Sequence, residues 1–330
     1  MPELRNTSPY EMFLQLARDH VPRHRFQAGR DVLEWRSETL PGVLATLGRR
    51  PAPVDPRPEL LAEWQQDGVI VQRWLIDVSP GLSAFVYLNR PVDLPAGARP
   101  PGILCWHGHS AGGKEAVIGN ITAPEVAADV QRTRTDYGLR MAQHGFVTFA
   151  IDWMGYGDQD DRQKPNHRHL DHGRDWCNLY YLQATMLGMT SLGINLAHGR
   201  ALVDFVLGLG LVDPDRLGVM GLSGGGTMTL WSALTDSRLK AAEIICYSDL
   251  FSVFGFRDIN YCGMQITPGL FDLVDLPDLQ GLLAPRPLLI DIGIHDECFR
   301  LESAMSCYSR VAEIYAAAGA ADRLELDRFP

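Results

Sequence analysis

The stretch Arg216–Leu234, "RLGVMGLSGGGTMTLWSAL", decides the fold. An apolar run ends in a glycine-rich turn that holds Ser223, and a segment of helical character follows. The turn matches the pattern G-x-S-x-G, in which a serine occupies a strained bend between a strand and a helix with its hydroxyl exposed. Side chains at Gly221 and Gly225 would collide with the strand and the helix, so glycine is expected at both positions. The stretch therefore predicts a strand, a nucleophilic serine and a helix in direct succession.

Short apolar segments alternate with helical segments on both sides of this stretch. Such alternation indicates an α/β fold with a mostly parallel central sheet covered by helices on both faces. Ligands bind beyond the carboxyl ends of the strands of such sheets, so functional residues are expected in the loops that follow them. Strands are predicted at 102–108, 146–152, 216–223, 241–248 and 287–293, and helices at 136–144, 193–209, 225–234 and 302–318.

Two regions are predicted along the chain. Residues 1–68 read as a helical extension packed on the core, with a helix at 8–20 and a short helix after the prolines of 51–58. Residues 69–330 read as an α/β domain, which begins with two strands joined by the turn "SPG".

Two long insertions follow strands in the second region, at about 155–190 and 250–283. Long ordered connections are often functional, so we expect both to act as lids or as the rim of a pocket. The first insertion holds a histidine-rich segment, 167–172, whose role the sequence leaves open.

Composition restricts the class of protein. The chain has 330 residues, 46% of them hydrophobic, and a formal net charge of −10. An acidic chain is a poor partner for nucleic acid or an anionic membrane, so neither is expected. There is no apolar run long enough for a transmembrane helix and no pattern of a signal peptide, which favours a cytoplasmic protein. The six scattered cysteines form no CxxC pair, so reduced thiols are expected and a metal site is not.

A serine nucleophile needs two hydrogen-bond donors for the oxyanion that forms during acyl transfer. One donor is expected to be the backbone N–H of Gly224, the residue after the serine. The other is expected from the loop that begins His107-Gly108-His109, because it directly follows an apolar strand; we assign it to the N–H of His109. The alternative, that His107 and His109 bind a metal, is disfavoured because no third ligand follows at a usual spacing.

The acid of a catalytic triad is expected after a later strand. Asp291 lies within the apolar run 287–293, whereas Asp296 lies just past its end, where a carboxylate can reach a histidine. We therefore assign the acid to Asp296.

With these pieces placed, the chain resembles the α/β-hydrolase superfamily, and within it the branch of dienelactone hydrolases and acetyl-xylan-esterase-like proteins. The similarity runs from about Val69 to the end. It implies hydrolysis of a small-molecule carboxylic ester through a covalent acyl-enzyme, without a cofactor. The stretches that carry it are Trp106–Gly113, Ala150–Asp158, Gly221–Gly226 and Ala284–Asp296.

The resemblance also implies a triad histidine after one more helix and one more strand, but the sequence stops at Pro330 before reaching one. Serine without a general base is a poor nucleophile. We therefore expect the C-terminal end to be incomplete and the histidine to lie beyond Pro330. Two alternatives stay open: a non-catalytic binding protein on the same fold, or another histidine in this role. The candidates are His107, His109, His167, His169, His172 and His295.

A peptidase of the prolyl-oligopeptidase kind is a further alternative. Such enzymes usually carry a β-propeller before the catalytic domain, and the roughly 65 residues that precede the first strand are too few for one. The identity of the ester and the oligomeric state, including a homo-oligomer, are left open by the sequence.

Overall fold

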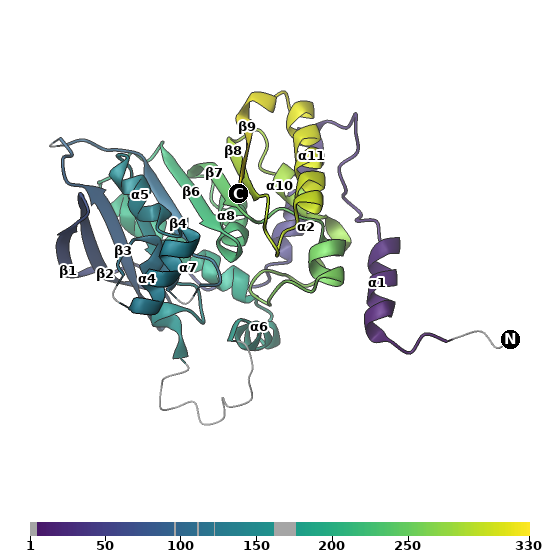
Figure 1. The fold of residues 1–330 in the computed structure, drawn as a ribbon, viewed down its shortest axis with the longest axis horizontal. Helices are drawn as coiled ribbons and strands as arrows, with labels where there is room; N and C mark the ends of the chain where they lie inside the picture. Colours follow the sequence, from purple (N-terminus) through teal and green to yellow (C-terminus); the bar gives the residue numbers. More distant parts are fainter. Residues whose placement is uncertain (1–4, 96, 111, 122, 162–175) are drawn as a thin grey trace.

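The computed structural model describes residues 5–95, 97–110, 112–121, 123–161 and 176–330, which build one nine-stranded sheet with helices on both faces (Figure 1). The order across the sheet is β1-β2-β3-β5-β4-β6-β7-β8-β9. The first three strands run antiparallel and join β5 antiparallel, and all later pairs are parallel. The strands are β1 (Glu59–Gln66), β2 (Val69–Ser79), β3 (Leu82–Pro91), β4 (Gly102–Trp106), β5 (Val147–Ile151), β6 (Leu217–Leu222), β7 (Leu239–Ile245), β8 (Leu288–Gly293) and β9 (Leu324–Phe329).

Helices cover the sheet unequally. The face that carries α7 and α8 also carries α10 and α11, and the opposite face carries α3 to α5. The helices are α1 (Pro9–Asp19), α2 (Val32–Ala45), α3 (Gly113–Val117), α4 (Pro124–Thr133), α5 (Tyr137–Gln143), α6 (Trp176–Met186), α7 (Ser191–Gly208), α8 (Gly224–Thr235), α9 (Leu270–Leu273), α10 (Leu276–Gly281) and α11 (Leu301–Ala317), with single turns η1 (Gly157–Gln159), η3 (Ser252–Arg257) and η4 (Ala321–Arg323).

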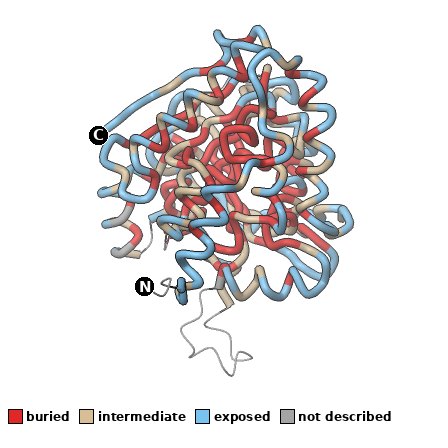
Figure 2. Tube along the Cα trace, turned by 90° about the vertical axis from the view of Figure 1, so that its right-hand side faces the viewer, coloured by how far each residue is buried: buried red, intermediate tan, exposed pale blue. Residues whose placement is uncertain are grey.

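Alternation along the central strands divides the core into two layers. In β4, Leu104 and Trp106 belong to the cluster beneath α7 and α8, whereas Ile103 and Cys105 belong to the cluster beneath α5. Successive side chains of a strand point to opposite faces, so a strand that is apolar throughout fills both layers. Figure 2 shows the buried residues gathered along the middle of the molecule.

The predicted α/β fold is confirmed, with the predicted central strands and helices in place within a few residues. The short helix expected after the prolines is wrong, because residues 59–66 form the edge strand β1. Asp67 and Gly68, with φ of 47° and 82°, make the tight turn that pairs β1 with β2. An Asp-Gly pair between two strands is typical of a β-hairpin turn, so residues 59–66 form a strand rather than a helix. The division at residue 68 stays a prediction.

No helix in the described ranges is long and apolar enough to cross a membrane.

Candidate active site

Ser223 lies at the sharp turn between β6 and α8. Its φ of 57° and ψ of −116° are strained for a residue with a side chain, and such strain concentrates at functional sites. The turn is held by two hydrogen bonds: Ser223 N donates to Ile245 O at 2.8 Å, and Thr227 N donates to Ser223 O at 3.2 Å. The structure therefore confirms the predicted order of a strand, a strained serine and a helix.

Close backbone contacts explain the glycines of the motif. A Cβ on Gly221 would lie 2.5 Å from Gly225 O, and a Cβ on Gly225 would overlap Trp106 O. A Cβ on Gly108 would lie 2.8 Å from Leu222 O. The three glycines thus let β6, α8 and the loop after β4 approach one another around the serine, as the motif requires.

A cavity of about 270 Å³ opens beside Ser223. Part of its wall is the segment Ile259–Cys262 of the second insertion, and the loop after β4 contributes His109. The second insertion thus forms part of the pocket rim, as predicted. Its lining also includes Gln265, Cys298 and Phe299.

The two predicted oxyanion donors lie close to this cavity. A Cβ on Gly224 would lie 2.8 Å from Cε1 of His109, so the His109 ring covers the start of α8. Among the described residues, the backbone N–H groups of His109 and Gly224 have no hydrogen-bond acceptor. The Gly224 amide lies at the start of α8 and the His109 amide in the loop after β4. Amides without an acceptor are available to an anion, so the proposed oxyanion hole stays consistent with the geometry.

A buried ion cluster fixes the loop after β4. Lys114, fully buried, places Nζ 2.5 Å from Asp152 and 2.6 Å from Asp158. Asp152 also accepts hydrogen bonds from the backbone N–H groups of Lys114 and Asp158, at 2.9 and 3.0 Å. Burial opposes the charge of Lys114, but the two carboxylates outweigh it and raise its pKa. The cluster therefore ties the loop after β4 to the loop after β5.

His107 serves this same scaffold rather than the cavity. Its ring is buried, and Nδ1 accepts a hydrogen bond from the Trp153 indole at 2.7 Å. Burial lowers the pKa of His107 to about 4, so the ring is neutral near pH 7. Trp153 in turn stacks on Tyr156, with centroids 5.2 Å apart. These contacts position the neighbouring His109.

Asp296 lies in the loop after β8, at the carboxyl edge of the sheet, as predicted. Its Oδ1 accepts hydrogen bonds from the N–H groups of Cys298 and Phe299, at 2.7 and 3.0 Å. It lines a hollow of about 940 Å³ that also borders Leu222, the residue before the serine, and His295. Asp296 and Ser223 thus line two different hollows. The turn that holds Ser223 borders the hollow of Asp296 through Leu222.

Within the described residues, no hydrogen bond joins the Ser223 hydroxyl to a histidine, so the general base stays unassigned. Among their histidines, only His109 lines the cavity of Ser223, and its Nε2 lies 3.2 Å from Cys262 Sγ. His295 lines the hollow of Asp296. The candidates His167, His169 and His172 lie outside the described residues.

Asp291 differs from Asp296 as the sequence predicted, because it lies within β8 and is buried. Its carboxyl group pairs with Glu243 of the neighbouring strand β7. Burial, together with the negative charge of Glu243 and Asp327, raises the pKa of Asp291 to about 8. The Asp291–Glu243 pair therefore favours holding a proton within the sheet.

This carboxyl pair predicts a pH-dependent stability. The folded protein holds a proton on Asp291 that the unfolded chain releases above about pH 4, so the free energy of unfolding should fall as pH rises toward 8. Asp291→Asn keeps a donor for Glu243 without a charge. We expect this variant to be more stable than the parent near pH 9 by at least about 1 kcal/mol, since one pKa unit corresponds to about 1.4 kcal/mol.

Urea unfolding near pH 5 and near pH 9 measures this difference, with the exposed Asp322→Asn as the matched control. A gain from Asp291→Asn that is equal at both pH values would contradict the assignment.

A cluster of three groups near the cavity was missed by the sequence analysis. His109, Cys177 and Cys262 place their ligand atoms within 4.8 Å of one another. Hydrogen bonding with Cys262 lowers the pKa of the Cys177 thiol. The three residues come from separate loops and helices, so no spacing along the chain signals them. All six cysteines are thiols, and both of these are buried.

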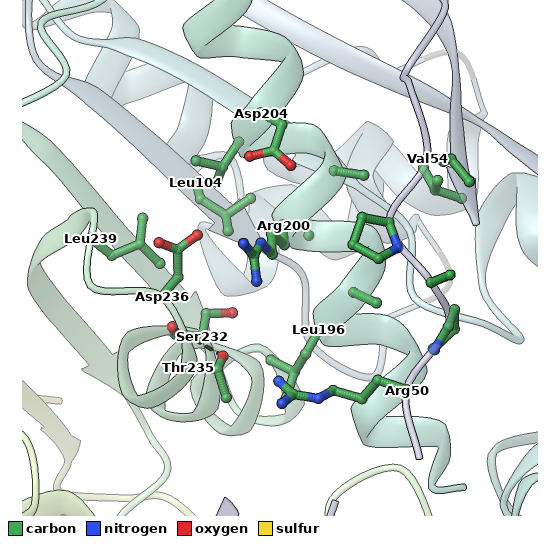
Figure 3. Close-up of a pocket in the computed structure, with 18 residues that line it drawn as sticks. Arg50, Val54, Leu104, Leu196, Arg200, Asp204, Ser232, Thr235, Asp236 and Leu239 are labelled. Atoms are coloured by element: carbon green, nitrogen blue, oxygen red, sulfur yellow. Dashed lines mark hydrogen bonds between the residues drawn. The ribbon is translucent and has the colours of Figure 1, made fainter. Parts of the chain in front are cut away.

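A second cavity, of about 240 Å³, lies away from Ser223 between α7, α8 and the segment 50–54 (Figure 3). Arg200, Asp204 and Asp236 surround it. Its serine, Ser232, accepts a hydrogen bond from the buried Trp106 indole at 3.0 Å, which is a packing role. None of the predicted site residues lines it.

The mostly parallel sheet, the serine turn and the acid loop together define the α/β-hydrolase fold. The chain belongs to the Abhydrolase family, whose sequence model matches residues 3–318. The protein YtaP of Bacillus subtilis (strain 168), which carries a provisional name as a hydrolase, is 25% identical over 280 residues, or 83% of this chain and 84% of YtaP.

Solved structures agree on the fold. A Bacteroides fragilis NCTC 9343 protein provisionally described as an acetyl xylan esterase is similar with a TM-score of 0.77, at 18% identity, over 100% of this chain and 84% of its own. A glucuronoyl esterase from Solibacter usitatus has a TM-score of 0.62 at 16% identity, over 91% and 89% of the two chains. The resemblance to α/β-hydrolases of the acetyl-xylan-esterase-like branch is confirmed at the level of fold. The dienelactone hydrolase resemblance stays a prediction.

Proposed function

We propose that the protein is a serine hydrolase of carboxylic esters. The observation that carries the proposal is the strained turn at Ser223, which opens onto a cavity beside two backbone N–H groups that have no acceptor in the described part of the chain. Ser223 Oγ attacks the acyl carbon and expels the alcohol, and the N–H groups of His109 and Gly224 hold the oxyanion. Water then releases the acid from the acyl-enzyme.

The proposal assigns the base to a histidine that Asp296 orients and that lies outside the described residues. Two backbone N–H groups already hold Oδ1 of the Asp296 carboxylate in place. The histidine takes the proton from Ser223 and later gives it to the leaving alcohol.

The size of the cavity favours a short acyl group. Ligand pockets commonly measure about 300 to 1,000 Å³, and the space at Ser223 is about 270 Å³. Two proteins of similar fold are named as acetyl xylan esterases, which supports an acetylated carbohydrate as the substrate class. The acyl group then enters the cavity, and the alcohol part stays outside it.

The test uses the full chain with a fluorophosphonate probe and with p-nitrophenyl esters of increasing acyl length. We expect the probe to label Ser223, as read by peptide mass spectrometry. We expect kcat/KM for the acetate to exceed that for the octanoate by at least about tenfold, because a tight pocket penalises each added methylene.

Absence of both labelling and turnover would overturn the proposal in favour of a binding protein. Cleavage of a prolyl p-nitroanilide without ester hydrolysis would overturn it in favour of a peptidase.

A further inference from the structure

The cluster of His109, Cys177 and Cys262 lies where three separate segments meet at the wall of the cavity. His109 comes from the loop after β4, Cys177 from the start of α6, and Cys262 from the loop between η3 and α9. Their ligand atoms lie within 4.8 Å of one another, and His109 Nε2 lies 3.2 Å from Cys262 Sγ. Both cysteines are buried, with 1% and 6% of their surfaces exposed.

The chemistry of these groups is that of a soft metal site. Zinc in proteins binds cysteine sulfur at about 2.3 Å and histidine nitrogen at about 2.0–2.1 Å. Two such ligands on one tetrahedral ion are therefore roughly 3.6–3.8 Å apart. Ligand atoms that already lie within 4.8 Å of one another need shifts of only about 1 Å to close on an ion.

Neighbouring hydrogen bonds hold the ligands in place. Cys262 N donates to the Gln265 side chain at 3.1 Å, and Gly263 N donates to the Asn178 side chain at 2.8 Å, which joins the loop of Cys262 to α6. The His109 ring meets the edge of Trp153 with centroids 5.0 Å apart. Supports of this kind set the orientation of metal ligands in known sites.

We propose that His109, Cys177 and Cys262 form a binding site for a thiophilic divalent cation, with Zn²⁺ as the representative ion. Two thiolates and one imidazole are a ligand set that prefers Zn²⁺ over Mg²⁺ or Ca²⁺. Three protein ligands leave a fourth position, and His109 and Cys262 both border the cavity of Ser223. An ion there joins the loop after β4 to both insertions. The proposal does not depend on Ser223 being a nucleophile.

The test measures binding rather than activity. The protein is reduced, stripped of metal with a chelator, and titrated with Zn²⁺ against a competing chromophoric chelator. We expect one equivalent to bind and thermal unfolding to shift upward with Zn²⁺, because a ligand that binds only the folded state stabilises it. Cys177→Ser and Cys262→Ser should each weaken binding at least about 100-fold, since even changes behind the ligands cost about 10–100-fold.

Cys298→Ser is the matched control, because Cys298 lines the same cavity but lies outside the cluster. It should leave the Zn²⁺ affinity unchanged. Co²⁺ gives a second readout in the parent protein, where thiolate ligands produce strong near-ultraviolet absorption; this keeps the test valid if a serine variant fails to fold. His109→Gln should weaken binding while keeping that absorption.

Three results would overturn the proposal. They are no Zn²⁺ binding by the reduced parent protein, loss of binding in Cys298→Ser as large as in the cluster variants, or Co²⁺ binding without thiolate absorption. A Cys177–Cys262 disulfide together with no metal binding in the reduced form would assign the pair to redox chemistry instead.

Discussion

Ser223→Ala should lower ester hydrolysis by at least about 1,000-fold and abolish labelling by a fluorophosphonate, because removal of a catalytic serine leaves only the contribution of binding and the oxyanion hole. Alanine keeps the Cβ and the same backbone strain, so the turn at φ 57° is unchanged. The loss should therefore fall on kcat, with the free energy of unfolding close to that of the parent. Steady-state kinetics and urea unfolding of both proteins measure the two quantities.

Ser309→Ala is a suitable control, since Ser309 is exposed on α11 and its hydroxyl donates to Met305 O within the same helix. Its activity and labelling should match those of the parent. If Ser223→Ala kept a tenth or more of the parent activity, the nucleophile would have to lie elsewhere.

Lys114→Ala should destabilise the protein by about 3–5 kcal/mol, which is the usual effect of removing one partner from a buried ion pair. Both Lys114 and Asp152 are buried, with 0% and 1% of their side chains exposed, so the remaining carboxylate would be left without a counter-charge. Equilibrium unfolding in urea at neutral pH measures the loss. Lys240→Ala, a change at an exposed lysine, should stay within about 0.5 kcal/mol.

A second variant separates charge from packing. Lys114→Met fills most of the same space without a charge, so it should be nearly as destabilising as alanine if the ion cluster dominates. A methionine variant as stable as the parent would show that the side chain acts through its volume alone.

The features that the sequence predicted well are those with local causes. The strand before Ser223, the turn and α8 follow from an apolar run, a glycine pattern and a helical segment that adjoin one another. The position of Asp296 follows from its place just after an apolar strand. Local pattern also contained the Asp67-Gly68 turn, and its hairpin signal would have corrected the short helix predicted near it.

The features that the sequence missed arise from contacts between distant segments. An isolated lysine reads as a surface residue, and only the fold brings Lys114 against Asp152 and Asp158 in its interior. The sequence analysis discounted His109 as a metal ligand because no partner follows nearby along the chain. Its partners, Cys177 and Cys262, come from the two insertions, whose approach depends on the packing of α6 against the later loop.

The buried ion cluster also bears on how this chain can vary among related organisms. Lys114 and Asp152 compensate each other's charge where water does not reach, and Asp158 adds a second carboxylate from the partly exposed edge, so a change at Lys114 or Asp152 alone is costly. Natural variants should therefore exchange the lysine and its aspartates together, as one inherited unit. Substitutions at these positions are expected to occur together during evolution, whereas residues on the exposed face of α11 can change one at a time.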